Sequence, residues 1–100
     1  MGLKAGLVDE HGAWISRSAA GDGGALVRAT EYPEDYPSIA GIDVYGETIF
    51  ARSDLPALLD ELLRLIDETT RQDELQWLLD VRDLADRCQR EDAYLKFLGD

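Results

Sequence analysis

The sequence predicts an α+β domain with two layers, in which a small, mostly antiparallel sheet of three to five short strands is covered by two antiparallel C-terminal helices. In the first half of the chain, short apolar runs alternate with glycine, proline and acidic residues, a pattern typical of strands and turns. From residue 53 onward, apolar residues recur every three or four positions, which indicates helices. The length of 100 residues, 45% of them hydrophobic, fits one domain over residues 1–100 with one core.

A hairpin is expected to open the fold. Apolar residues in 3–8 and 13–17 flank the turn-like Asp9-Glu10-His11-Gly12 stretch. Residues 18–24 are small and rich in glycine, which favours a flexible loop. Three more short strands are predicted, at residues 25–30, 39–44 and 48–51.

The second half predicts two helices with a short connection between them. The first helix begins near Ser53, a residue type that caps helix N-termini, and leaves its charged residues, Glu61 among them, facing outward. Thr69 and Gln72 offer a capping box for the second helix, whose apolar spacing continues to Leu98. The two apolar stripes are Leu55, Leu59, Leu62 and Ile66 in the first helix, and Trp77, Val81, Leu84, Cys88 and Leu95 in the second. Stripes of this width need a broad apolar surface, such as a sheet.

Acidic side chains outnumber basic ones by 21 to 10, and the formal net charge is −11. The surplus is densest at residues 31–50, which hold five acids and no base. Direct binding to DNA, RNA or an anionic membrane is disfavoured, because it requires clustered Lys and Arg. The charge favours solubility and electrostatic steering toward a basic partner. A solvated acidic surface without a partner is the alternative.

A cytoplasmic location is expected from the cysteine content and from the N-terminal residues. Cys88 is the only cysteine, so a disulfide within the chain and a cysteine-based zinc site are excluded. A lone cysteine is typical of a reducing compartment. The first residues contain no signal-peptide pattern, and acids interrupt the longest apolar stretch, so no membrane span is expected.

Catalytic sets and cofactor sites are not recognisable, so the chain is expected not to be an enzyme and to need neither cofactor nor metal. His11 is the only histidine and falls in a predicted exposed turn. Cys88 falls on an apolar stripe, which favours a buried thiol over a nucleophile. Asp43 and Glu47 flank the predicted turn at Tyr45-Gly46 and could act as an acid/base pair, but a solvated acidic turn would have the same sequence.

A protein-binding surface is the functional prediction that residues 31–50 support. This stretch holds three of the four tyrosines and two of the three prolines. Tyrosine supplies a large contact area with a polar tip, and surrounding carboxylates select basic partners. The predicted partner-binding residues are Glu31, Tyr32, Glu34, Asp35, Tyr36, Asp43, Tyr45 and Glu47. In the alternative interpretation, the tyrosines cover the edge of the sheet and the acids face water.

The run GIDVYGETIF at residues 41–50, a leucine-rich helix after it and the closing YLKFLGD at residues 94–100 resemble small acidic uncharacterised proteins of high-GC bacteria such as the actinobacteria. This resemblance covers residues 41–100 and implies no activity and no site residue. In size and charge the chain is also similar to bacterial immunity proteins, which bind basic nuclease toxins through acidic, often tyrosine-bearing surfaces. That second likeness is one of character, not of motif.

Two functional hypotheses follow from the sequence. The first is a non-enzymatic acidic binding module of the immunity or inhibitor type, a monomer or homodimer that binds a basic protein. The second is a structural or regulatory subunit that forms a homodimer through an apolar helix face. Trp77 with Leu78 and Leu79 gives the second helix more apolar width than one core needs.

Overall fold

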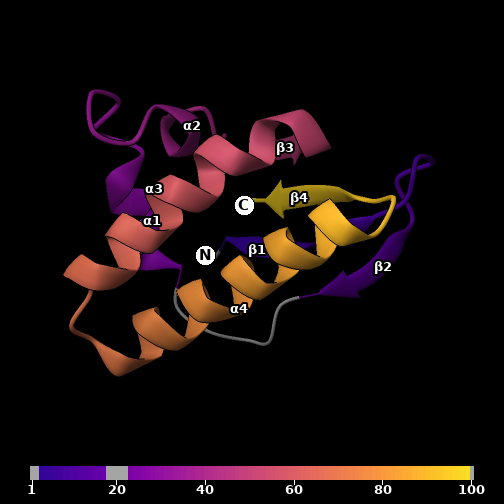
Figure 1. Ribbon diagram of the computed structural model, residues 1–100. Helices are drawn as coiled ribbons and strands as arrows, with labels where there is room; N and C mark the ends of the chain where they lie inside the picture. Colours follow the sequence, from indigo (N-terminus) through magenta and orange to yellow (C-terminus); the bar gives the residue numbers. More distant parts are fainter. Residues whose placement is uncertain (1–2, 18–22, 100) are drawn as a thin grey trace.

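We describe the protein from a computed structural model, which places residues 3–17 and 23–99 (Figure 1). Its elements, in chain order, are β1 (Lys4–Val8), β2 (Trp14–Arg17), α1 (Gly24–Ala29), α2 (Pro37–Ala40), β3 (Glu47–Phe50), the 3₁₀ turn η1 (Arg52–Asp54), α3 (Leu55–Glu68), α4 (Gln72–Arg90) and β4 (Tyr94–Leu98). This is the predicted α+β class. Most of the predicted loop at residues 18–24 lies outside the described residues.

The four strands form one antiparallel sheet in the order β2-β1-β4-β3. β1 pairs with β2 as the predicted hairpin and, on its other side, with β4, where Gly6 lies opposite Lys96. β3 also pairs with β4, with Thr48 opposite Phe97. β4 therefore joins two parts of the sheet that have no pairing with each other.

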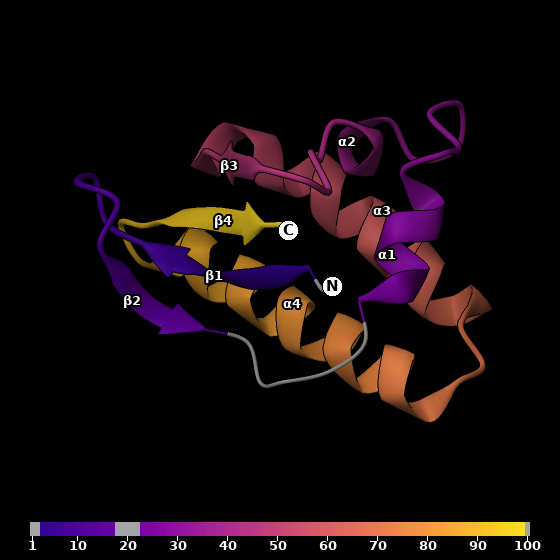
Figure 2. The ribbon, with the colours of Figure 1, turned by 180° about the vertical axis from the view of Figure 1, so that it is seen from behind.

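The antiparallel helices α3 and α4 lie on one face of this sheet, as predicted, and no described helix crosses the opposite face (Figure 2). Leu7, Leu95 and Phe97 of the sheet are fully buried against Leu62 and Leu78 of the helices. Burying each of these side chains contributes about 1.5 to 3 kcal/mol. The short helices α1 and α2 complete the core beside α3.

The predicted hairpin owes its tight turn to Asp9 and Gly12. The Asp9 carboxylate accepts the backbone N–H groups of His11 and Ala13, each at 2.9 Å. These two bonds lower the pKa of Asp9. Gly12 has a φ of 83°, a conformation that residues with a Cβ rarely adopt.

Two of the predicted strands are helical instead. Residues 25–30 fall largely in α1, where Ala25, Leu26 and Ala29 share the buried face. A six-residue apolar run fits a strand and one turn and a half of helix equally well, so its period did not decide between them. Residues 39–44 contain the end of α2 followed by turns, because Pro37 starts a helical turn at its first position. The strand predicted at residues 48–51 is confirmed as β3.

The second predicted helix is too long. α4 ends at Arg90, and the residues that continue its spacing form β4 at the centre of the sheet. Leu95 lies seven residues after Cys88, a helical spacing, but Leu95 and Phe97 are buried in alternation with the less buried Tyr94 and Lys96. That alternation is the signature of a strand.

The predicted helix starts are also displaced. α3 follows η1, in which the Asp54 carboxylate accepts the backbone N–H of Ala51 at 3.0 Å, so Ser53 is not the cap. α4 begins at Gln72, and the Thr69 hydroxyl donates to the carbonyl oxygen of Leu65 instead of forming a capping box.

Candidate functional site

Helix α2 divides the predicted binding segment into two surfaces (Figures 1 and 2). The α1–α2 loop comprises residues 31–36, and the α2–β3 turn comprises residues 42–47, including the first residue of β3. In both views the loop lies at the end of the molecule beyond α2, while the turn lies on the other side of α2, next to the sheet. The eight predicted binding residues thus do not form one patch.

The α1–α2 loop exposes most of its acidic side chains. Its backbone is folded by two bonds to the carbonyl oxygen of Tyr32, from the N–H of Asp35 at 3.1 Å and of Tyr36 at 2.9 Å. Glu31, Glu34 and Asp35 are exposed, and the Tyr32 side chain is 58% exposed. Within residues 3–17 and 23–99, none of the three carboxylates has a hydrogen bond or an ion pair. The loop therefore presents charge that the described residues leave uncompensated.

Tyr36 ends this loop and is buried, with only 7% of its surface exposed. Its hydroxyl donates to Oε2 of Glu68 on α3 at 2.9 Å, and the guanidinium of Arg64 lies 5.3 Å from its ring centre. Burial, together with the neighbouring carboxylate of Glu68, raises the pKa of Tyr36. Tyr36 therefore anchors the loop to α3, and its ring offers little surface to a protein partner.

The acids of the α2–β3 turn are used within the protein. Oδ1 of Asp43 accepts the backbone N–H of Tyr45 at 3.0 Å, and the N–H of Asp43 donates to the Thr48 hydroxyl at 2.8 Å. Glu47 lies 3.4 Å from the ammonium of Lys96. Tyr45 is 74% exposed. The turn therefore offers a partner one exposed tyrosine and carboxylates that already have protein contacts.

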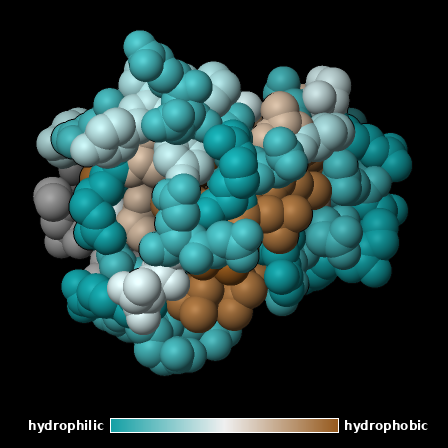
Figure 3. Space-filling model, turned by 60° about the vertical axis from the view of Figure 1, so that its left-hand side comes forward, coloured by the Kyte–Doolittle hydropathy of each residue, from teal (hydrophilic) through white to brown (hydrophobic). Residues whose placement is uncertain are grey.

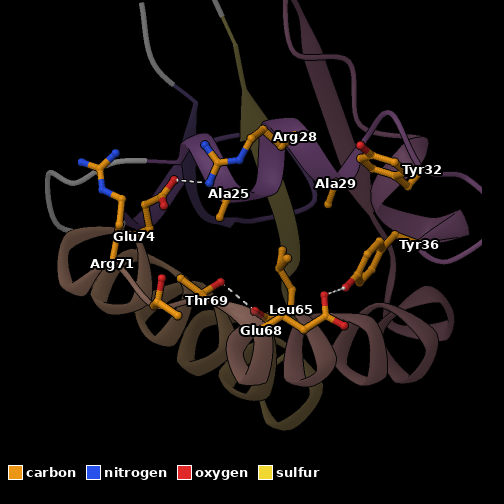
Figure 4. A pocket seen from close by; sticks show the side chains of 11 residues that line it. Ala25, Arg28, Ala29, Tyr32, Tyr36, Leu65, Glu68, Thr69, Arg71 and Glu74 are labelled. Atoms are coloured by element: carbon orange, nitrogen blue, oxygen red, sulfur yellow. Dashed lines mark hydrogen bonds and ion pairs between the residues drawn. The ribbon is translucent and has the colours of Figure 1, made fainter.

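A pocket of about 340 Å³ lies beside the α1–α2 loop (Figure 4). Five segments surround it: α1, the loop, the C-terminal end of α3, the α3–α4 connection and the start of α4. Its lining residues are Ala25, Arg28, Ala29, Tyr32, Tyr36, Leu65, Glu68, Thr69, Thr70, Arg71 and Glu74. Asp43 and Glu47, the acid/base pair considered from the sequence, do not line this pocket.

The pocket has polar groups at two ends and apolar side chains between them. At one end the guanidinium of Arg28 donates to Oε2 of Glu74 at 2.7 Å, and at the other Tyr36 donates to Glu68 (Figure 4). Ala29 and Leu65 lie between these ends. The Glu74 side chain is only 3% exposed, but it lies in the first turn of α4, where the helix dipole favours a carboxylate. Such a pocket can hold an elongated group with an apolar body and a polar end.

Two buried glutamates position this site, and sequence reasoning missed both. Glu61 was predicted to face outward but is 3% exposed. Its carboxylate accepts the backbone N–H groups of Ser38 and Ile39 at 2.9 to 3.0 Å, and so caps the N-terminus of α2. For Glu74 the sequence predicted no role. Both helices carry several acidic residues, and the sequence gives no signal of which of them meets a partner.

The remaining candidate residues have simple surroundings. His11 is exposed and lies 3.5 Å from Glu10. Cys88 is buried on α4, as predicted, where its thiol donates to the carbonyl oxygen of Ala93 at 3.0 Å and burial raises its pKa. The described residues contain no group of three His, Cys, Asp or Glu side chains that could hold a metal ion. None of the described helices is long and apolar enough to cross a bilayer.

The apolar face of the helix pair differs from the one expected. Trp77 and Leu78 are both buried in the core, so the extra width of α4 is used inside the chain. An apolar seam remains outside, where Leu63 is 48% exposed. Leu59, Ile66, Leu75 and Leu79 are partly exposed on the same helices. Figure 3 shows apolar surface gathered over α3 and α4.

Comparisons with protein-family models, with curated proteins and with solved structures find no match for this chain.

Proposed function

We propose that this chain is a non-enzymatic binding module of the immunity or inhibitor type, which binds a basic protein mainly through the α1–α2 loop. The observation that carries this proposal is the set of three exposed carboxylates without a described partner, Glu31, Glu34 and Asp35, beside the exposed ring of Tyr32. Uncompensated negative charge on a protein surface speeds its association with a positively charged partner. An exposed tyrosine adds contact area at low entropic cost.

The neighbouring pocket supplies a place for an anchoring side chain of the partner. A lysine or arginine has an apolar stem and a cationic head, which matches a cavity with Leu65 and Ala29 inside and Glu68 at one end. Glu68 accepts the Tyr36 hydroxyl through Oε2 only, and a carboxylate has room for further donors. Binding in the pocket would thus continue the acidic loop surface inward.

The α2–β3 turn has a smaller role in this binding than its sequence predicts. Glu47 and Asp43 already have contacts within the protein, so a partner would have to displace or share them. The turn contributes the exposed ring of Tyr45. We therefore place the centre of binding at residues 31–35.

The test compares two double charge reversals that change the net charge equally. Immobilised protein is exposed to a lysate of the native host at low salt, and any basic protein retained is identified, produced recombinantly and titrated by calorimetry. Glu34→Lys with Asp35→Lys should weaken its binding by at least about 100-fold, because attraction becomes repulsion in a contact region. Asp60→Lys with Asp67→Lys, on the exposed side of α3, should change it less than about threefold, as screened charges remote from a contact do.

Equal losses in the two double variants would mean that only the overall charge matters, and the proposed surface would be wrong. Retention of no basic protein at low salt would contradict the proposed partner. Tyr32→Ala with Tyr32→Phe as its control separates the ring from the hydroxyl, and the proposal expects the larger loss from alanine.

The second candidate is a homodimeric structural or regulatory subunit, which the apolar seam on α3 and α4 favours. A dimer across this seam would cover Leu63, the most exposed of its side chains. Sedimentation over a range of concentrations would then show a dimer that Leu63→Glu with Leu79→Glu dissociates. Ala57→Glu, also exposed on α3, is the control. A monomer of 11.1 kDa at all concentrations would reject this candidate.

A further inference from the structure

The open face of the sheet has a different chemistry from the rest of the molecule. Ala5, Leu7, Leu95 and Phe97 belong to the core on the helix side. Because neighbouring strand residues point to opposite faces, Lys4, Gly6, Tyr94 and Lys96 lie on the open face. Val8 agrees, since it is buried but absent from the helix-side core. β3 adds Ile49 and Glu47 to this face, in register with Lys96 and Leu98.

The ring of Trp14 of β2 lies over Gly6 on this face. A Cβ on Gly6 would lie 2.6 Å from Cζ3 of Trp14, so the ring rests directly on the glycine of the neighbouring strand. The guanidinium of Arg17 and the ammonium of Lys96 lie 4.8 and 4.9 Å from the ring centre. These cation–π contacts hold two positive charges beside an aromatic surface.

The cations of this face are not balanced as those of α4 are. On α4 and just before it, arginines have nearby carboxylates, as in Arg87 with Glu91 and Arg90 with Asp86. Lys96 of the sheet pairs with Glu47. Lys4 and Arg17 have no ion pair with any residue that the structure describes. A chain with a net charge of −11 thus carries a locally positive face.

Apolar side chains accompany this positive charge. Ile49 on the edge strand β3 is 46% exposed, and Tyr94 on the central strand β4 is 38% exposed. Solvent-exposed apolar groups beside unpaired cations are poorly solvated by water. A partner that carries both acidic and apolar side chains can contact both kinds of group.

We propose that the open face of the sheet is a docking surface for an acidic segment of another protein that also carries apolar side chains. Its carboxylates pair with Lys4 and Arg17, and its apolar side chains cover Trp14, Tyr94 and Ile49. This surface is separate from the α1–α2 loop, so the inference does not rest on the proposed function. With both surfaces in use, the protein would link a basic partner to an acidic one.

Charge favours an acidic protein segment on this face over a second copy of the chain and over a nucleic-acid strand. A second copy related by a two-fold axis would place Lys4 and Arg17 against the same cations, which repel one another. A nucleic-acid strand brings one negative charge per nucleotide into the field of a strongly acidic protein and finds two unpaired cations to meet it. A protein segment can bring a few carboxylates and apolar groups together.

The test is a titration of the isotope-labelled protein, followed by amide and indole NMR signals. The probe is a short peptide of Glu-Glu-Leu-Ser repeats, and its counterpart has Gln in place of Glu. The acidic peptide should shift the signals of β1, β2, β4 and the Trp14 indole. The Gln peptide should bind at least about tenfold more weakly, because it keeps the apolar groups and loses the charges.

A matched pair of variants locates the contact. Lys4→Glu with Arg17→Glu should weaken binding of the acidic peptide at least about tenfold, whereas Arg82→Glu with Arg90→Glu, the same charge change on α4, should leave it within about twofold. Glu34→Lys with Asp35→Lys should not weaken it, which separates this surface from the α1–α2 loop. The comparison of the two peptides on the unmodified protein holds even where a variant fails to fold.

Equal binding of the acidic and Gln peptides would overturn the proposal, as would shifts confined to the α1–α2 loop. Binding of an oligothymidylate to this face without binding of the acidic peptide would assign the face to nucleic acid instead.

Discussion

The α1–α2 loop and the α2–β3 turn come from one acidic stretch of sequence, but their carboxylates have different surroundings. In the turn, Asp43 bonds a backbone N–H and Glu47 lies beside Lys96. In the loop, Glu34 and Asp35 are exposed without a described partner. The difference shows that the charge available to a partner is what remains after the fold has used its own share.

Helix α2 keeps these two regions apart, and Glu61 anchors it. Removing this anchor should have the largest effect on stability. Replacing Glu61 by Ala leaves the buried N–H of Ile39 without its acceptor. Losing a charged acceptor of a buried donor should lower the free energy of unfolding by about 2 to 4 kcal/mol. Urea unfolding should show this loss of stability. Asp60→Ala, one position away and exposed, should cost less than about 0.5 kcal/mol. Equal effects would show that Glu61 does not anchor α2.

Tyr36 gives the loop a pH-dependent attachment to α3. Its raised pKa means that its contribution to stability is complete below its unfolded value of about 10 and is lost as the pH rises through the higher folded value. Tyr36→Phe should cost about 1 kcal/mol near neutral pH, from the lost hydrogen bond to Glu68. Urea unfolding at a series of pH values should show this difference shrinking above about pH 10. A difference that grew there would contradict the assignment.

A pair of alanine substitutions compares the two regions directly. Asp43→Ala removes the acceptor of the Tyr45 N–H and should cost about 0.5 to 1 kcal/mol. Asp35→Ala removes no described contact of its carboxylate and should change stability by less than about 0.5 kcal/mol. Thermal unfolding of both variants checks the order, and a larger cost for Asp35 would reverse the comparison.

The smallest effect is expected for Glu47. The Glu47 side chain is half exposed where it contacts Lys96. Glu47→Gln should therefore lower the free energy of unfolding by only about 0.2 to 0.5 kcal/mol, and by less in high salt. The same substitution also frees Lys96, and we expect it to strengthen binding of the acidic peptide to the open sheet face. Unchanged binding would show that Lys96 takes no part in that contact.

The sequence predicted the parts of the fold whose period is long enough to measure. The leucine pattern of α3 and the stripe of α4 extend over many turns, and the hairpin has an unmistakable turn at Asp9 to Gly12. It also predicted the short strand β3, but it failed on α1, α2 and β4. α1 and α2 are six and four residues long, and β4 carries one residue at a helical spacing from Cys88. In these cases tertiary packing decided between two structures that local pattern allows.

The candidate site was predictable in composition but not in arrangement. The acids and tyrosines of residues 31–47 could be named from the sequence, whereas the hydrogen bond of the buried Tyr36 goes to Glu68, which is far along the chain. Glu61 and Glu74 became visible only through the N-terminus of α2 and through Arg28. The cationic face of the sheet was hidden for the same reason, since Lys4, Arg17 and Lys96 are dispersed in sequence.

The place of β4 between β1 and β3 sets the order in which a newly made chain can fold. On the ribosome, β1 and β3 are both synthesised long before their shared partner, and Lys4 can pair with Leu98 only after that residue has emerged. Until then Leu7 and Phe50 have no central strand beside them, so we expect nascent chains that stop before residue 94 to be bound by chaperones. Limited proteolysis of released chains that end on either side of residue 98 should locate the step at which the sheet closes.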